Sequence, residues 1–591
     1  MKNRLNAIIE NNLRGPFSEL GVSSLTGIIE LQETPDSSKG DFALNSAMKL
    51  AKTLKQPPIK IASKVAESLS REKEWFREVV VAPPGFVNIF LSENAIEKIL
   101  IEITTDLNKA LRTESEPIKV IVDYSSVNIA KQMHVGHLRS TIIGDVISRV
   151  LEARGETVIR QNHLGDWGLP MAMVLWKARP VLREIENRKG NLEKELTLTD
   201  LENIYRDAAK ACKDDLSATK TCQEILVRLQ SGDRELLEDW KKIVRLSMDE
   251  VYRIYQLLGV QLTDEHERGE SFYRDQLSGT VEAIKASGKL VESQGAKCVF
   301  LEHFKAKDGS PLPVIVQKSD GGFNYETFDL AGIRFRIEKL RASRLIYVTD
   351  ARQALHFAQV FDVAAVCGLT GSGKGMISLE HVPFGSVLGE DNKPLKTRGG
   401  ENIKLSELLN EAIERAYAVV KEKNPALAED KKRSVARAVG IGAVKYADLA
   451  QNRNNDYVFS WEKMLAFNGN TAPYLQYAHA RICSIFRKGG FEEENIKCFP
   501  KLAHPVERAL AMKLVRFPEM VAAVERELRP HILCNFLFDL ATAFSVFFDQ
   551  CPVLAAETDE IRQNRLALCG MVRRTLEYGL DLLGIESPRE M

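Results

Sequence analysis

Residues 128–137 read Asn-Ile-Ala-Lys-Gln-Met-His-Val-Gly-His, and a stretch with helical periodicity begins directly afterwards at Leu138. Two histidines, His134 and His137, therefore flank the small residue Gly136 at the N-terminus of a predicted helix. Their imidazoles can donate hydrogen bonds to phosphate oxygens, the glycine lets a nucleotide approach the backbone, and the free N–H groups of the first turn favour negative charge. Taken alone, the tetrapeptide is a weak motif, because two histidines can equally cap a helix or lie in a core.

The residues around this motif predict the sheet to which it belongs. Residues 118–123 (Ile-Lys-Val-Ile-Val-Asp) form a short apolar run rich in β-branched side chains, followed by a loop and the predicted helix. This order is typical of the first βα unit of a nucleotide-binding parallel sheet. Strand-like runs return at 314–317 and 345–348, and we expect this half of the sheet to close near residue 400. The helical, highly charged pattern from about 170 to 290 indicates an insertion between the two halves of the sheet.

Two further domains are predicted on either side of this one. The first part of the chain alternates helical patterns with strand-like runs at 79–81 and 86–91, which indicates a compact α+β domain. After residue 404 the periodicity is almost entirely helical. The predicted domains are an N-terminal α+β domain at 1–112, a Rossmann-like α/β catalytic domain with a parallel sheet at 117–400, and a C-terminal all-α helical bundle at 401–591.

The composition says more about the cellular environment of the protein than about its function. The 591 residues carry 81 basic and 81 acidic side chains, so any RNA-binding surface must arise from local segregation of charge. The nine cysteines include no Cys-x-x-Cys pair, which argues against a disulfide framework and a zinc ribbon. No apolar run approaches the ~18 residues that we take as the minimum for a membrane span. We expect a cytoplasmic protein without membrane association or a structural metal.

Motifs spread over nearly the whole chain share one resemblance. They lie at 126–131 and 138–145, on either side of the double-histidine motif, and at 162–168, 318–322, 329–331 and 469–478. Together they resemble class I aminoacyl-tRNA synthetases, and specifically the arginyl-tRNA synthetases, whose HIGH motif corresponds to residues 134–137. One departure is Val127, where the family usually has proline; this loop is then less rigid, but no chemical group is lost.

The resemblance implies ligation of L-arginine to its tRNA through arginyl-adenylate. ATP would be the second substrate, Mg²⁺ would accompany it, and we expect a monomer. Activation is an in-line attack of the arginine carboxylate on the α-phosphate, which needs positive charge and hydrogen-bond donors rather than a nucleophilic side chain. Lys131, His134 and His137, with Gly136 between the imidazoles, are the catalytic residues expected at this end of the nucleotide.

The second phosphate-binding element of such enzymes, the KMSKS loop, is matched here only in a degenerate form. Residues 395–400 read Leu-Lys-Thr-Arg-Gly-Gly, and Gly399 stands where the second lysine would be. The resemblance implies that Lys396 and Arg398 take part in catalysis and that Lys131 compensates for the missing lysine. A solvated loop is the alternative interpretation.

A Walker A-like stretch at 368–375 is a weaker candidate for phosphate binding. Gly375 replaces the Ser or Thr that would hold magnesium, and the residues after it predict a strand instead of a helix. We therefore interpret it as a flexible glycine turn.

The arginine substrate presents a guanidinium with five donors, which carboxylates and other acceptors can match. Asp329 and Tyr325 lie one helical turn apart and project from one predicted helix face. The resemblance implies that both contact the guanidinium. The remaining residues that it implies for the arginine site are Glu270, Asp123, Asn128, Gln353 and Ser126. Without the surrounding motif, Asp329 would be interpreted as a helix cap or a surface acid.

Three residues of the segment 380–385, His381, Val382 and Phe384, resemble the family's adenine-pocket segment, although Phe384 could equally be a core residue. For tRNA, Phe86 and Asn88 match N-terminal family positions that contact the corner of the D-loop, where an aromatic ring can stack on an unpaired base. A core role for Phe86 is the alternative. In the C-terminal bundle, aromatic and basic residues are interleaved as anticodon recognition requires, with Tyr457, Trp461 and Tyr474 as candidates. Some of these aromatics must be core, and His479 could be buried.

Two other functions fit part of the pattern. A small-molecule adenylating ligase of the pantothenate-synthetase type shares the HIGH-type motif but does not need the helical last third of the chain. A degenerate synthetase paralogue that only binds RNA would not need His134, His137, Lys131, Tyr325 and Asp329 together. The sequence therefore favours an arginine–tRNA ligase.

Overall fold

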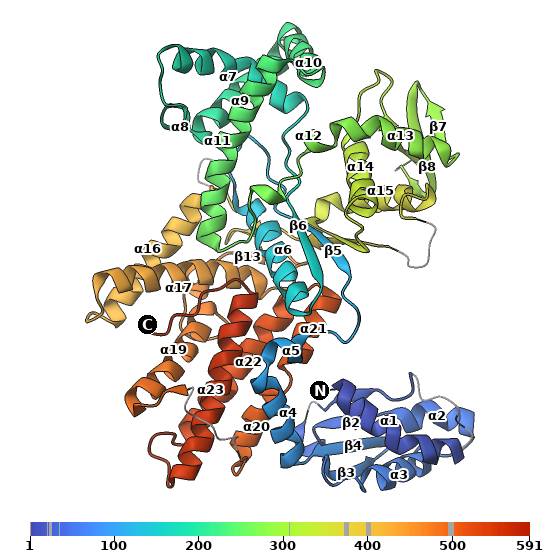
Figure 1. Ribbon diagram of the computed structural model, residues 1–591, viewed down its shortest axis with the longest axis vertical. Coiled ribbons are helices and arrows are strands. Elements are labelled where there is room, and N and C mark those ends of the chain that lie inside the picture. Colours follow the sequence, from blue (N-terminus) through green and yellow to red (C-terminus); the bar gives the residue numbers. More distant parts are fainter. Residues whose placement is uncertain are drawn as a thin grey trace.

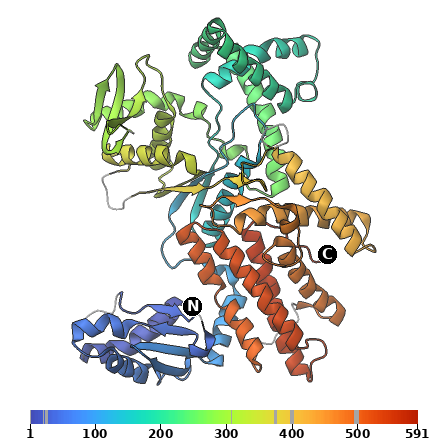
Figure 2. The same ribbon diagram turned by 180° about the vertical axis from the view of Figure 1, so that it is seen from behind.

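The fold was analysed in a computed structural model, which describes residues 2–19, 22, 27–34, 36–306, 308–371, 377–396, 403–493 and 501–591. Figure 1 shows an N-terminal domain, a central parallel sheet carrying two outlying subdomains, and a helical bundle. The view from behind confirms that the N-terminal domain lies beside the bundle, at the opposite end from the helical subdomain (Figure 2).

The N-terminal domain is a four-stranded antiparallel sheet with helices on one face. Alternate residues of β4, Val87, Ile89 and Leu91, are buried in the core, so Phe86 and Asn88 project from the opposite face. The expected strand at 86–91 is confirmed. The elements are α1 (Lys2–Glu19), β1 (Leu31–Glu33), η1 (Ser37–Lys39), β2 (Phe42–Leu44), α2 (Ser46–Leu54), α3 (Pro58–Leu69), β3 (Phe76–Ala82) and β4 (Phe86–Leu91).

Two helices, α4 (Glu93–Thr105) and α5 (Leu107–Leu111), lead from this domain to the rest of the molecule. Ser92 caps α4 by accepting a hydrogen bond from the N–H of Ala95, so this helix begins directly after β4 ends. Along this path α4 contacts α20 (Pro505–Leu514) and α5 contacts α21 (Phe517–Glu527), both in the C-terminal bundle.

The central sheet has four parallel strands in the order β11-β10-β5-β6. Val120, Ile121 and Val122 of β5 are fully buried, as expected for a strand covered on both faces. The strands are β5 (Lys119–Asp123), β6 (Thr157–Gln161), β10 (Arg344–Asp350) and β11 (Ser378–Phe384), and the helices that flank them are α6 (Val135–Ala153), α14 (Tyr325–Glu338), η4 (Ala351–Gln353) and α15 (Ala354–Val366). The predicted βα unit and the strand at 345–348 are confirmed.

The expectation that residues 314–317 belong to this sheet is wrong. They form the end of β9 (Pro311–Gln317), in a separate antiparallel sheet with β7 (Leu290–Ser293) and β8 (Ala296–Lys305). Both kinds of strand are short and apolar, so periodicity does not distinguish them.

In the chain, the helical part of the insertion lies between β6 and this small antiparallel subdomain. It projects away from the central sheet (Figure 1). Its helices are α7 (Leu169–Asn187), α8 (Leu192–Glu195), α9 (Leu198–Asp214), α10 (Leu216–Gln230) and α11 (Arg234–Leu258), and the chain returns through η2 (Asp264–His266), α12 (Glu270–Tyr273), η3 (Arg274–Gln276) and α13 (Leu277–Ala286).

The C-terminal bundle packs against α6, the helix that follows the double-histidine motif. The bundle is also tied to the insertion, because the fully buried amine of Lys445 donates to the carbonyl of Leu258, at the end of α11, at 2.7 Å and to that of Gly584. The bundle contains α16 (Leu405–Lys423), α17 (Glu429–Leu449), α18 (Trp461–Met464), α19 (Ala472–Gly489), α20 (Pro505–Leu514), α21 (Phe517–Glu527), α22 (His531–Gln550) and α23 (Asp559–Leu582), and the short strands β12 (Val387–Leu388) and β13 (Tyr457–Val458) pair beside it.

Among the described residues, α22 has the length and apolar composition to cross a bilayer. It contacts α20, α21 and α23, and it buries Leu537, Leu540 and Phe544. Its apolar side chains therefore form part of the core of the bundle.

Candidate active site

The double-histidine motif forms the N-terminus of α6. The Nδ1 atom of His134 accepts the N–H of Gly136 at 3.0 Å, and Nδ1 of His137 accepts the N–H of His134 at 3.2 Å. The histidines thus cap the helix, which the sequence offered as an alternative to phosphate binding. Because Nδ1 of each ring is an acceptor, each neutral imidazole carries its proton on Nε2 and can donate that hydrogen to another group. Capping and phosphate binding are compatible here.

Burial keeps these imidazoles uncharged. It lowers the pKa of His134, and burial together with the nearby His134 and Lys131 lowers the pKa of His137 to about 3. Gly136 is needed for this arrangement, since a Cβ atom at this position would lie 2.8 Å from Cε1 of His134. The two rings, with centroids 4.1 Å apart, are therefore neutral donors at pH 7.

The loop between β5 and α6 is held in an unusual backbone conformation. Ser125, Ser126 and Ala130 have φ angles of 72°, 50° and 59°, in the left-handed region that side chains other than glycine rarely adopt. Asn162 accepts the N–H of Ser126 at 3.0 Å, and the hydroxyl of Tyr255 lies 2.6 Å from that of Ser125. The loop is therefore fixed by β6 and α11 rather than by the proline that Val127 replaces.

Lys131 lies in this loop and reaches toward the insertion. Its Nζ atom lies 4.6 Å from the ring centroid of Tyr205 on α9. This is a cation–π contact, which contributes roughly 0.5–1 kcal/mol at an exposed site. The ammonium group can leave this ring for a phosphate at modest cost.

A group of acidic residues surrounds the start of α14. Asp329 accepts a hydrogen bond from Nε2 of His356 at 2.6 Å, and Glu326 lies 3.8 Å from Nδ1 of the same ring. Although burial opposes its charge, these hydrogen bonds raise the pKa of His356 to about 10. Burial and the carboxylates of Asp166 and Asp329 raise the pKa of Glu270 to about 8. At pH 7 the group thus holds a charged histidine and a protonated Glu270.

His356 was missed in the sequence, where no motif marks it. It lies in the first turn of α15, three residues after Gln353 at the N-cap of this helix, so helical spacing could have placed it beside the arginine-site residues. The structure leaves Tyr325 66% exposed beside this group, and Gln353 and Asn128 are also exposed. Their polar atoms are open to a ligand.

The carboxylate of Asp123 already has a partner within the protein. Its carboxylate is buried and forms an ion pair with Arg336 of α14, whose Nε also donates to Gln161 at 2.6 Å. A carboxylate already paired with a buried guanidinium is not available to bind a second one at full strength. Its placement favours a supporting role beneath the pocket over the direct contact that the resemblance implied.

The expected adenine-pocket residues divide between two faces of β11. Val382 and Phe384 are buried in the core, whereas the His381 ring stacks on Phe357 and lies 2.9 Å from the hydroxyl of Thr349. Successive residues of a strand point to opposite faces, so these side chains cannot all line one pocket. The burial of Phe384 is what the core alternative expects.

Comparison with known proteins identifies the family to which this geometry belongs. Three family models match in succession: the arginyl tRNA synthetase N terminal domain at residues 3–91, the catalytic domain of class I (R) tRNA synthetases at 96–461, and the DALR anticodon binding domain at 475–591. The chain belongs to the arginyl-tRNA synthetase family. The predicted fold class and the prediction of an arginine–tRNA ligase are confirmed.

Individual relatives agree over the full length. The chain is 44% identical to the arginine–tRNA ligase of Azotobacter vinelandii, with 100% of both chains covered, and 46% identical to that of Cellvibrio japonicus, with 93% and 94% covered. The arginyl-tRNA synthetase structures of Plasmodium falciparum and Thermus thermophilus match with TM-scores of 0.83 and 0.79, at 29% and 26% identity. They cover 100% of this chain and 99% and 100% of their own. A small-molecule ligase does not account for this match.

The loop predicted to be the second phosphate-binding element, residues 395–400, is described only in part. Lys396 is exposed, and Arg398 lies outside the described residues. Directly after the gap, Ile403 accepts the N–H of Val135 at 3.2 Å and Leu405 donates to the carbonyl of Met133 at 2.9 Å. These hydrogen bonds join the segment to the HIGH-type motif. Residues 372–375 of the Walker A-like stretch also lie outside the described residues, and β11 follows the stretch, as the sequence predicted.

The aromatic candidates for tRNA contact in the synthetase's bundle differ in exposure. Tyr457 is buried, with its ring 5.3 Å from the guanidinium of Arg139, so it is a core residue and not a free stacking platform. Trp461 and Tyr474 are half-buried. Tyr477, on α19 with Tyr474, is 47% exposed. His479 is buried and hydrogen-bonded to the carbonyl of Pro588, which confirms the expectation for this residue.

Proposed function

We propose that the HIGH-type motif and the acidic group at α14 are the two halves of one site, which holds ATP at the first and the side chain of L-arginine at the second. The observation that carries this proposal is the position of both at the carboxyl ends of neighbouring parallel strands. The motif follows β5, and the His356 segment follows β10, which pairs with β5. In open parallel sheets, this edge is where ligands bind.

In the first step, a carboxylate oxygen of arginine attacks the α-phosphorus, and the bond from that phosphorus to the bridging oxygen breaks as pyrophosphate leaves. Negative charge develops on the phosphate oxygens. The Nε2–H groups of His134 and His137 and the first-turn N–H groups of α6 would donate to these oxygens, and Lys131 would supply positive charge. In the second step, a hydroxyl at the 3′ end of the tRNA attacks the carbonyl carbon of arginine, and AMP leaves.

The guanidinium would be held by Asp329 and Glu270, with Tyr325 beside them. Arginine is recognised here through charge and planar hydrogen-bonding geometry, which a lysine side chain does not reproduce. Asp123 would act indirectly, because its ion pair with Arg336 ties β5 to α14 and so fixes the helix that carries Asp329.

Magnesium would enter as part of the ATP complex. No group of three or more His, Cys, Asp or Glu side chains suited to a metal ion occurs among the described residues. We assign Lys396 and Arg398 to the far end of the triphosphate, Phe86 and Asn88 to the corner of the tRNA, and Trp461 and Tyr474 to its anticodon end. One chain carries all these surfaces, which supports a monomer, and we place it in the cytoplasm, where arginine–tRNA ligases normally act.

Charging assays test this assignment. The purified protein is incubated with total tRNA, ATP and each amino acid in turn, and we expect product with arginine alone. The matched pair His137→Asn and His303→Asn separates the catalytic proposal from a general effect, because His303 lies on β8 in an exposed pair with Asp362. Loss of activity in His137→Asn with unchanged melting is expected; equal activity in both variants would refute the role of the motif.

A further inference from the structure

The junction between the N-terminal domain and the C-terminal bundle is built around one arginine. Arg508 of α20 donates from Nη1 and Nη2 to the two carboxylate oxygens of Asp41, at 3.0 and 2.7 Å. Asp41 lies in the N-terminal domain at the start of β2, and its side chain is 4% exposed. Two parallel N–H···O bonds fix orientation as well as distance, and burial protects them from screening by salt.

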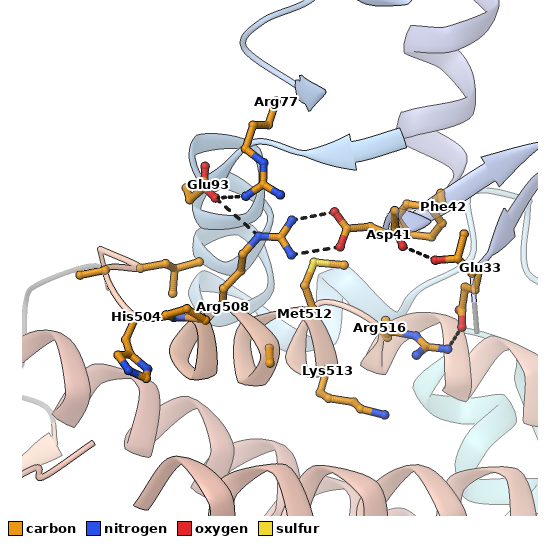
Figure 3. Close-up of a pocket in the computed structure, with 16 residues that line it drawn as sticks. Glu33, Asp41, Phe42, Arg77, Glu93, His504, Arg508, Met512, Lys513 and Arg516 are labelled. Carbon is orange, nitrogen blue, oxygen red and sulfur yellow. Dashed lines mark hydrogen bonds and ion pairs between the residues drawn. The ribbon is translucent and has the colours of Figure 1, made fainter. Parts of the chain in front are cut away.

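Arg508 also forms a hydrogen bond with the end of β4. Nη2 of Arg508 donates to the carbonyl of Leu91 at 3.1 Å, and the N–H of Leu91 donates to Asp41 at 2.7 Å. Glu93 lies 3.5 Å from Nε of Arg508 and accepts from Arg77 at 3.0 Å. Figure 3 shows the guanidinium of Arg508 between Asp41 and Glu93. Arg508, Asp41 and Leu91 thus form a closed set of hydrogen bonds.

Charged side chains connect the N-terminal domain and the C-terminal bundle at this junction. A cavity of about 610 Å³ is lined by residues of both bodies, including Phe42 and Met512. A second ion pair, between Arg516 and Glu33, spans the same junction (Figure 3). Around this cavity the two bodies are joined by ion pairs, in addition to the packing of α4 on α20 and of α5 on α21.

The strand held in this way is the one that carries the proposed tRNA contacts. Phe86 and Asn88 lie on β4, and Leu91 ends the same strand. At the other side of the junction, α20 packs on α22 and α23, the core of the bundle. Arg508 therefore links the strand proposed to contact the tRNA corner to the domain proposed to contact the anticodon.

We propose that Arg508 is a positioning residue for tRNA, which sets the spacing between the Phe86–Asn88 surface and the bundle so that one tRNA meets both at once. The inference rests on the proposed function of these two surfaces. Two linked contacts bind more tightly than either alone only while their geometry allows simultaneous engagement. When Arg508 is lost, the two domains can move relative to each other. Part of the free energy of tRNA binding is then used to order them.

The test uses Asp41→Asn, Arg508→Gln and the double variant in the full-length enzyme. We expect each single variant to raise KM for tRNA by about tenfold, part of the ~10²–10⁴-fold gain that two linked contacts provide. The double variant should be no worse than either single one, because all three lack the same bond. KM for arginine and ATP and kcat at saturating tRNA should stay unchanged, and small-angle X-ray scattering should report a broader distribution of interatomic distances.

Two further variants complete the test. Arg71→Gln is the control, because Arg71 follows α3 on the helical side of the same domain and forms only an exposed ion pair with Glu67. Asn88→Ala tests the tRNA surface itself. A normal tRNA KM in Arg508→Gln with a raised one in Asn88→Ala would overturn the positioning role alone. Normal values in both would overturn the proposed tRNA surface and, with it, this inference. If Arg508→Gln does not fold, Asp41→Asn and Arg508→Lys give the same decision.

Discussion

We expect arginine binding to release a proton from Glu270. In the free enzyme, burial and the charges of Asp166 and Asp329 raise the pKa of Glu270 to about 8, so this carboxyl group is mainly protonated at pH 7. A bound guanidinium would favour the ionised form, because an opposite charge at close range stabilises it. The carboxyl group therefore loses its proton as arginine enters the pocket.

The size of the effect follows from the pKa. Ionising a group one unit below its pKa costs about 1.4 kcal/mol, which weakens arginine binding about tenfold at pH 7 relative to a pH well above 8. The direction of the change in affinity follows from the raised pKa, because Glu270 is mainly protonated below pH 8 when no arginine is bound. Affinity should thus rise with pH from 6 to 8 and level off above. The pKa of His356, raised to about 10, and that of His137, lowered to about 3, leave both histidines unchanged across this range.

Isothermal titration calorimetry in two buffers of different ionisation enthalpy counts the protons directly. About 0.9 proton should be released per arginine bound at pH 7, because that is the protonated fraction one unit below a pKa. Glu270→Gln should release none, bind with a flat pH dependence and lose affinity most strongly at pH 8. A wild-type dissociation constant that stays constant between pH 6 and 8 would refute the reasoning.

Three further outcomes are expected from steady-state kinetics. Asp329→Asn should raise KM for arginine about 10–150-fold and spare that for ATP, because a charge-assisted pair contributes ~1.5–3 kcal/mol; an equal loss for both substrates would make Asp329 structural. His356→Ala should raise KM for arginine, and His356→Asn should raise it less, since asparagine still donates to Asp329; identical values would argue against a hydrogen-bonding role. Lys131→Ala should lower kcat and kcat/KM together by ~10²–10³ with little change in melting, since its contact with Tyr205 is weak. Partial rescue by Gly399→Lys would support compensation between the two lysines, and near-normal turnover in Lys131→Ala would exclude it.

Local patterns carried most of the fold prediction. The β5–α6 unit was recognisable because a β-branched run is followed, after one loop, by a capped helix, and the start of the run and the start of the helix lie within about 20 residues of each other. Membership of a sheet is not a local property, which is why β9 was assigned to the wrong one. A parallel and an antiparallel strand of this length bury similar side chains, and only their partners differ.

Local sequence was also insufficient to predict the partners and the burial of single site residues. The ion pair between Asp123 and Arg336 spans 213 positions, so the sequence offered no sign that this carboxylate already has a partner. Tyr457 and Phe384 are aromatic residues whose burial depends on the packing of the bundle against the sheet. His356 is an intermediate case, because its spacing from Gln353 was visible but a lone histidine on a helix carries little information.

The buried amine of Lys445 has a consequence for the order of events during synthesis. Its two carbonyl acceptors, in Leu258 and Gly584, lie 187 residues before it and 139 after it in the chain. Burial lowers the pKa of this ammonium group to about 8, and a buried charge that lacks a partner is costly. A growing chain that has passed residue 445 holds only the first acceptor, so we expect the junction around α6 to stay hydrated until Gly584 has left the ribosome.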